Sequence, residues 1–145
     1  MRQFYFKDDH SPVYDYARYE PDSPGSARRS IYRFVVRSVT DPFLDTLDCA
    51  DPSLLTPKRS STTTALQALA MLNDPFVTRQ AEHLADRVAR AEKSPTRQIE
   101  LAYRIAFGRV ASPEELMAAK AYLPKHGLAN FCRLLFNTNE FMFVD

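Results

Sequence analysis

The chain has 145 residues, of which 45% are hydrophobic and 26% charged, the balance of a globular protein with a core. A formal net charge of +1 disfavours a protein whose main task is to grip a polyanion over a wide face. The apolar runs are short and broken by charges, so no membrane span is expected, and MRQFYFKDDH at the amino terminus lacks the apolar segment of a secretion signal.

Residues 1–30 combine turn signals with many aromatic side chains. Ser11-Pro12, Glu20-Pro21 and Ser23-Pro24 disfavour helix, because the residue before Pro is biased towards extended backbone. The aromatic residues are too many for a solvated tail: Phe4, Tyr5, Phe6, Tyr14, Tyr16 and Tyr19. We therefore expect an irregular, extended aromatic strap that lays its rings on a surface of this domain or of a neighbour.

The stretch ARRSIYRFVVRS, residues 27–38, fits two structures. As a strand it places Tyr32, Phe34 and Val36 on one face. As a helix it aligns Arg29, Arg33 and Arg37 at intervals of four residues. Its β-branched and aromatic content favours a short strand near residues 31–37 only slightly, and both alternatives stay open.

From residue 41 onward, Asp or Ser repeatedly precedes Pro. A short acceptor side chain at the N-cap followed by Pro at the first helical position is typical of a helix start. Ser112 also has Glu115 three residues later, which predicts a capping box. The dipeptides are Asp41-Pro42, Asp51-Pro52, Asp74-Pro75, Ser94-Pro95 and Ser112-Pro113.

The segments between these signals have helical periodicity. In the first, Leu66, Leu69, Ala70 and Asn73 form the expected stripe; in the second, Val77, Ala81, Leu84 and Val88 face inward. Gly108, Pro124 and Gly127 mark helix ends. The fold class predicted is mainly α, with residues 31–145 forming one compact bundle of roughly five helices, the last over about 128–137.

Several motifs recur in a known order: RRSIYRFVVRS, DPFLDTLDCADPS, Arg59-x-Ser61-x-x-Thr64, QALAMLND, AFGR followed by SPEE, and NTNEF at 137–141. Over residues 4–145 they resemble the C-terminal domain, called PSD-one, of a planctomycete-type, cytochrome-associated protein family of unknown function. The resemblance implies a piece of a longer, exported cell-envelope protein whose preceding domains, in the same or a split chain, are its partners. It implies no catalytic residue.

Five arginines form the first candidate site, for an anion or a partner: Arg28, Arg29, Arg33, Arg37 and Arg59. A guanidinium fork matches carboxylate or phosphate geometry. The alternative is that they pair with the nearby acidic run Asp41, Asp45, Asp48 and Asp51. That run offers oxygen ligands for a hard cation, but it lacks the alternating ligands and central Gly of an EF-hand. We predict no metal site and no cofactor.

The polar residues of the family-like motifs are the second candidate set: Gln67, Asn73, Asp74, Asn139 and Glu140. We expect Thr64 and Gln67 to form a capping box, and Asn73-Asp74 to join two helices. We expect Asn139 and Glu140 to form a buried polar clamp at the chain end, with a ligand pocket as the alternative.

Other polar groups offer weaker chemistry. His10, His83 and His126 have no ligand at a fixed spacing, and the hydroxyls of residues 60–64 have no oriented base. Cys49 and Cys132 fit either one bridge or two free thiols.

The leading functional hypothesis is a non-catalytic helical module that packs against or binds a protein partner. One alternative is an enzyme domain acting on a polymer, for which Asp45 and Asp48 are the candidate carboxylates. Another is an anion or nucleic-acid module using the arginines of residues 28–37, and nucleic acid is the less favoured partner because the net charge is small.

Overall fold

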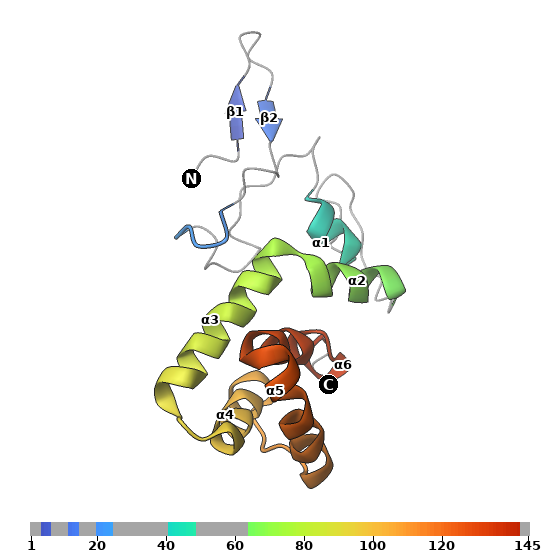
Figure 1. Ribbon diagram of the computed structural model, residues 1–145. Helices are drawn as coiled ribbons and strands as arrows, with labels where there is room; N and C mark the ends of the chain where they lie inside the picture. The colour runs from blue at the N-terminus through green and yellow to red at the C-terminus, as the bar shows by residue number, and fades with distance from the viewer. Residues whose placement is uncertain (1–3, 7–11, 15–19, 25–40, 49–63, 143–145) are drawn as a thin grey trace. The chain divides into compact units, whose positions relative to one another are not determined.

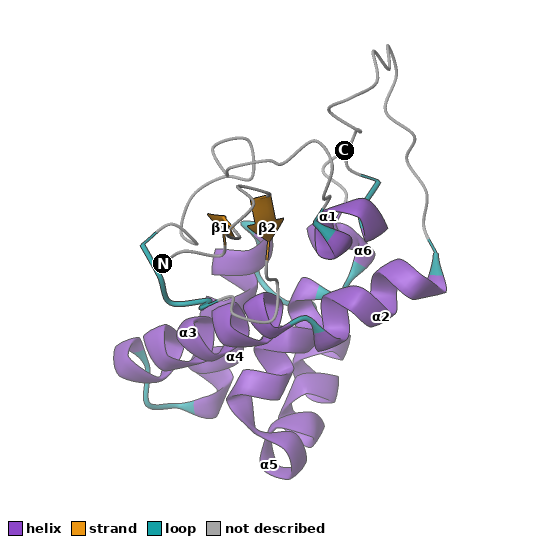
Figure 2. Ribbon diagram, turned by 90° about the horizontal axis from the view of Figure 1, so that it is seen from above, coloured by secondary structure: helices purple, strands orange, loops and turns teal. Residues whose placement is uncertain are grey.

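The chain folds mainly as α-helices, as the sequence predicts. A computed structural model describes residues 4–6, 12–14, 20–24, 41–48 and 64–142 (Figure 1). The chain divides into two compact units, residues 1–70 and 71–145. Among the described residues, helices predominate and two short strands are the exception (Figure 2). No described helix is long and apolar enough to span a membrane.

In the first unit, strands β1 (Phe4–Phe6) and β2 (Pro12–Tyr14) pair antiparallel, with Tyr5 opposite Val13. The sequence predicts irregular backbone here, and the structure differs from that prediction by this short pair of strands. Three-residue strands lie below the length at which alternation of side chains gives a clear signal. The stretch 31–37, left open between helix and strand, lies outside the described residues.

Helix α1 (Pro42–Thr46) begins where the sequence predicts. The Asp41 carboxylate accepts hydrogen bonds from the backbone N–H groups of Phe43 at 3.0 Å and Leu44 at 3.4 Å. The helix ends after one turn, and Asp48 takes a left-handed conformation with φ of 57°. Asp tolerates this region because its short side chain can hydrogen-bond locally.

Helix α2 (Ala65–Asn73) begins with the predicted capping box. Thr64 N–H donates to the Gln67 side-chain oxygen at 3.0 Å, and Gln67 N–H donates to the Thr64 hydroxyl at 3.2 Å. The predicted inward stripe is wrong at Leu66 and Leu69, which are exposed, whereas the polar Gln67 is buried. The Gln67 amide also donates to Asp48 at 2.9 Å, which helps to set the rotation of the helix.

The second unit contains α3 (Pro75–Ala91), α4 (Pro95–Phe107), α5 (Pro113–Phe136) and α6 (Asn139–Met142). Asp74 caps α3, accepting from Phe76 N–H at 2.8 Å. Ser112 and Glu115 form the predicted capping box of α5. Gly108 ends α4 with φ of 72°, where a side chain would be strained.

Helix α5 contains the break that the sequence predicts at its middle. Pro124 lies inside it, and Gly127 has φ of 80° and ψ of 166°, which is non-helical. Backbone in this region is essentially restricted to glycine. The long helix therefore consists of two helical segments that meet at Gly127, in agreement with the fourth and fifth predicted helices.

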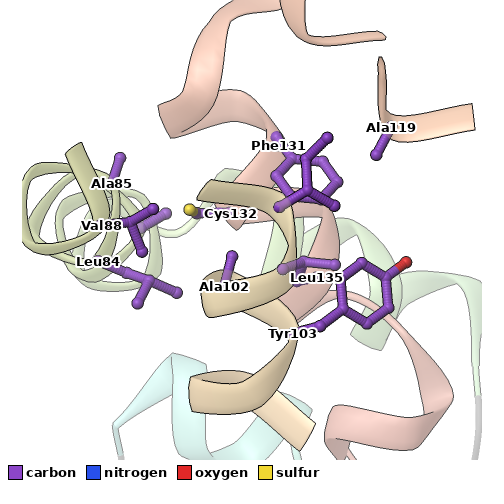
Figure 3. Packing of buried hydrophobic residues seen from close by; sticks show 11 residues of the cluster. Leu84, Ala85, Val88, Ala102, Tyr103, Ala119, Phe131, Cys132 and Leu135 are labelled. Atoms are coloured by element: carbon purple, nitrogen blue, oxygen red, sulfur yellow. The ribbon is translucent and has the colours of Figure 1, made fainter. Parts of the chain in front are cut away.

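The core of this unit lies between α3, α4 and α5. The largest fully buried side chains among the described residues are Val88, Ile99 and Cys132, one from each helix. Figure 3 shows side chains of α3 facing Cys132 of α5 and Ala102 of α4. Tyr103 contacts Phe107 edge to face, with ring centroids 5.3 Å apart, and lies 6.3 Å from Phe131. Each buried Ile or Val side chain contributes roughly 1.5–3 kcal/mol to this packing.

Candidate functional site: the Arg109 cluster

Three ends of helices meet at Arg109 in the second unit. Arg109 follows Gly108, the residue that ends α4. Glu115 is the third residue of α5, and Glu140 is the second residue of α6. We call these three side chains the Arg109 cluster. Because Gly108 turns the chain directly after α4, the Arg109 side chain can reach the starts of both later helices.

The guanidinium of Arg109 binds both carboxylates with two hydrogen bonds each. Its Nε and Nη2 donate to the two oxygens of Glu140, at 2.6 Å each. Its Nη1 and Nη2 donate to the two oxygens of Glu115, at 2.8 and 2.7 Å. Nη1 also donates to the Val110 carbonyl at 3.1 Å. Paired, charge-assisted bonds of this kind define both distance and orientation.

Aromatic rings support the same guanidinium from α4. Its central carbon lies 5.4 Å from the ring centre of Tyr103 and 5.6 Å from that of Phe107. Both distances are within the range of a cation–π interaction. Since Tyr103 is buried in the core, the cluster is anchored to the packed interior although its charged atoms contact solvent.

Hydrogen bonds from Arg109 lower the pKa of both carboxyl groups. The pKa of Glu115 falls to about 2, first because of Arg109 and further because the backbone N–H of Ser112 donates to it. The pKa of Glu140 is also lowered, again chiefly by Arg109. Burial raises the pKa of Tyr103, and the negative charge of Glu115 adds to that effect.

This electrostatic arrangement is poorly suited to proton transfer. A general acid needs a carboxyl group whose pKa is raised towards the working pH. Here two carboxylates converge, but Arg109 holds both in the ionised form. The cluster can position helices, and its half-exposed guanidinium can contribute to an interface with a partner.

The second set of sequence candidates has mainly structural contacts. Gln67 is buried and bonded to Thr64 and Asp48. Asn73 is the last residue of α2, and Asp74 caps α3. These two residues therefore join successive helices, as expected.

Asn139 and Glu140 are exposed, whereas the sequence suggested a buried clamp. The physical reason is that Glu140 binds Arg109 at the surface, and the short helix α6 contains no buried residue.

The remaining candidates separate into three groups. Asp41 caps α1, and Asp48 accepts a hydrogen bond from Gln67. Among the residues that the structure describes, no three His, Cys, Asp or Glu side chains form a potential metal site. His83 is exposed on α3, and His126 stacks on Tyr122 with ring centres 4.3 Å apart.

Cys132 is a free, buried thiol whose pKa is raised to about 12 by burial. The other sequence candidates lie outside the described residues: Arg28, Arg29, Arg33, Arg37, Arg59, Asp51, Cys49, His10 and the hydroxyls of 60–63.

Arg109 and Glu115 were not among the candidate site residues. The sequence identifies Glu115 only as a capping residue and Arg109 only as the last residue of the AFGR motif. The sequence does contain a signal for their pairing. Arg109 directly follows the Gly that ends a helix, and the acidic residue of the next capping box, Glu115, lies six residues later. The partner at Glu140 is 31 residues away in sequence, so only the fold reveals it.

No curated protein and no solved structure matches this chain. The model of one protein family, described as a protein of unknown function (DUF1553) and named PSD1, matches residues 6–123. The match includes Arg109 and Glu115 and ends before Glu140. The chain therefore belongs to the PSD1 (DUF1553) family of proteins of unknown function.

Proposed function

We propose that this chain is a non-catalytic helical interaction module. In this proposal the second unit presents a protein-docking surface next to the Arg109 cluster. The observation that carries the proposal is that the cluster is engaged in holding three helix ends together, while large apolar side chains close to it in sequence remain exposed.

Two of these apolar side chains lie close to the cluster in sequence. Val110 directly follows Arg109 and is 55% exposed. Met117 lies two residues beyond Glu115 and is 71% exposed. Covering the exposed parts of these two side chains contributes roughly 2–4 kcal/mol of apolar transfer free energy before the cost of association. Arg109 adds the planar guanidinium that is enriched in interfaces.

The rigidity of the cluster supports the same proposal. Docking loses less conformational entropy when the contact residues are already ordered. The two bonds from Arg109 to Glu115 tie the loop that carries Val110 to the first turn of α5, and Met117 follows in the next turn. The family resemblance makes preceding domains of a cell-envelope protein the first partners to test.

Site-specific photocrosslinking tests this function. A photoreactive benzoylphenylalanine replaces Met117 in the native cells, and the same substitution at exposed Lys125 on α5 serves as the control. We expect a discrete crosslinked protein at position 117 and none at position 125. The adduct should disappear when Val110→Asp is added.

Equal, diffuse crosslinking at both positions would contradict the proposal, as would an adduct that Val110→Asp leaves unchanged. The Val110→Asp chain should retain wild-type helicity by circular dichroism, because the side chain that it replaces is exposed.

A further inference from the structure

We propose that the corner between α3 and α4 is a second binding surface, which takes an acidic segment of a partner protein. Four basic residues gather there: Arg87, Arg90, Lys93 and Arg97. We call them the basic corner. This inference goes beyond the proposed function, because the basic corner lies at the opposite end of α4 from Arg109.

The chain geometry places the four residues at the connection between two helices. Arg87 and Arg90 lie in the last turns of α3, and Arg97 lies in the first turn of α4. The connection between these helices is short and tied, since the Gln98 side-chain amide donates to the Glu92 carbonyl at 2.8 Å. Lys93 turns back towards α3, with its Nζ 3.4 Å from the Ala89 carbonyl oxygen. The four cations thus occupy one corner of the unit.

These cations are available to a partner. All four residues are exposed. The ion pairs among the described residues involve Arg79 with Glu82 and Arg109 with its two carboxylates, and none includes a residue of the basic corner. Ser94, the N-cap of α4, makes no side-chain capping bond. The first-turn N–H groups of α4 therefore add partial positive charge beside Lys93 and Arg97.

Charge complementarity identifies the partner chemistry as carboxylate-bearing protein. Acidic residues flank and interrupt the cations in sequence, with Asp86 before Arg87, Glu92 before Lys93, and Glu100 one turn beyond Arg97. The closely spaced charges of a phosphate backbone or an anionic membrane would face these carboxylates as well as the cations. A peptide with separated Asp or Glu side chains can place each one against a cation.

A binding measurement with a defined probe tests the inference. The probe is a fluorescent peptide of alternating Glu and Ser, titrated with the whole chain and followed by anisotropy. The test variant is Arg87→Glu with Arg90→Glu. The matched control is Lys120→Glu with Lys125→Glu, which makes the same change in charge at exposed positions of α5.

We expect the test variant to weaken peptide affinity at least fivefold and the control to change it less than twofold. Peptide-induced shifts of backbone amide NMR signals should concentrate in residues 87–98. Equal weakening by both double variants, absence of peptide binding at low salt, or tighter binding of duplex DNA than of the peptide would each overturn the inference. Crosslinking at Met117 is a separate readout, so failure here leaves the proposed function to be judged on its own.

Discussion

Arg109 and Glu140 join the end of α4 to the start of α6 through two parallel hydrogen bonds of 2.6 Å, across 31 residues of sequence. Helix α6 has only four residues and contains no buried side chain. Phe141 of this helix also stacks on Phe136 of α5, at 4.7 Å between ring centres. The two hydrogen bonds between Arg109 and Glu140 are thus a principal attachment of this helix.

Replacing Arg109 with Lys should loosen α6. A lysine keeps the charge but cannot form two bidentate pairs at once. We expect faster amide hydrogen exchange in residues 138–142 and a lower melting temperature. Arg104→Lys is the control. Arg104 is exposed in the last turn of α4 and takes part in no ion pair among the described residues. Equal rates of amide hydrogen exchange in the two variants would show that the bonds from Arg109 do not hold α6 in place.

The stability of the fold should decrease at acid pH because Glu115 becomes protonated. Its pKa is about 2 in the folded chain and 4.5 in the reference state, so the folded form favours the ionised carboxylate. The stabilisation is therefore complete above about pH 4.5 and is lost as pH falls towards 2. The melting temperature of Glu115→Gln should fall less over this interval than that of the wild type. Parallel curves for the two proteins would contradict this assignment.

Truncating the core should have a large effect on stability. Ile99 is completely buried between the three helices, and Ile99→Ala should lower the free energy of unfolding by about 2–5 kcal/mol. Ile105→Ala on the same helix is the matched control, since Ile105 is exposed and should change stability by less than about 1 kcal/mol. Chemical denaturation measures both values. Similar losses would mean that α4 does not present Ile99 to the core.

The two glycines of this unit should respond differently to asparagine. Gly108 has φ of 72° and ψ of 4°, a left-handed conformation that Asn tolerates. Gly127 has φ of 80° and ψ of 166°, a region essentially restricted to glycine. Gly127→Asn should therefore destabilise the chain by about 1–3 kcal/mol, and Gly108→Asn by less. A larger loss at Gly108 would contradict the break in α5.

Local signals explain why most helix boundaries could be predicted. Asp74 and Ser112 cap helices through bonds to residues two or three positions away, so sequence proximity is sufficient to find them. Rotation of α2 was not predictable in this way. Leu66 and Leu69 suggested the inward face, but Gln67 points to Thr64 and Asp48, and the latter lies 19 residues away.

The candidate site was less predictable than the fold for the same reason. Glu140 was identified as a motif residue, but its partner Arg109 becomes apparent only when α4 and α6 are placed together. The basic corner likewise combines residues of two helices, α3 and α4. Its extension into α4 depends on the short connection that Gln98 closes. Contacts between distant residues have no periodic signature in a single sequence.

The size of the native, non-denatured assembly tests the central claim most directly. Size-exclusion chromatography of a gentle extract from native cells, followed with an antibody, would compare wild type with the double variant Val110→Asp and Met117→Asp. If the chain is an interaction module, the wild type should elute as part of a larger complex. The double variant should elute later, at the size of its own chain. A double variant that remains in the same complex, or a wild type that elutes alone with a sharp, reversible melt, would contradict the account.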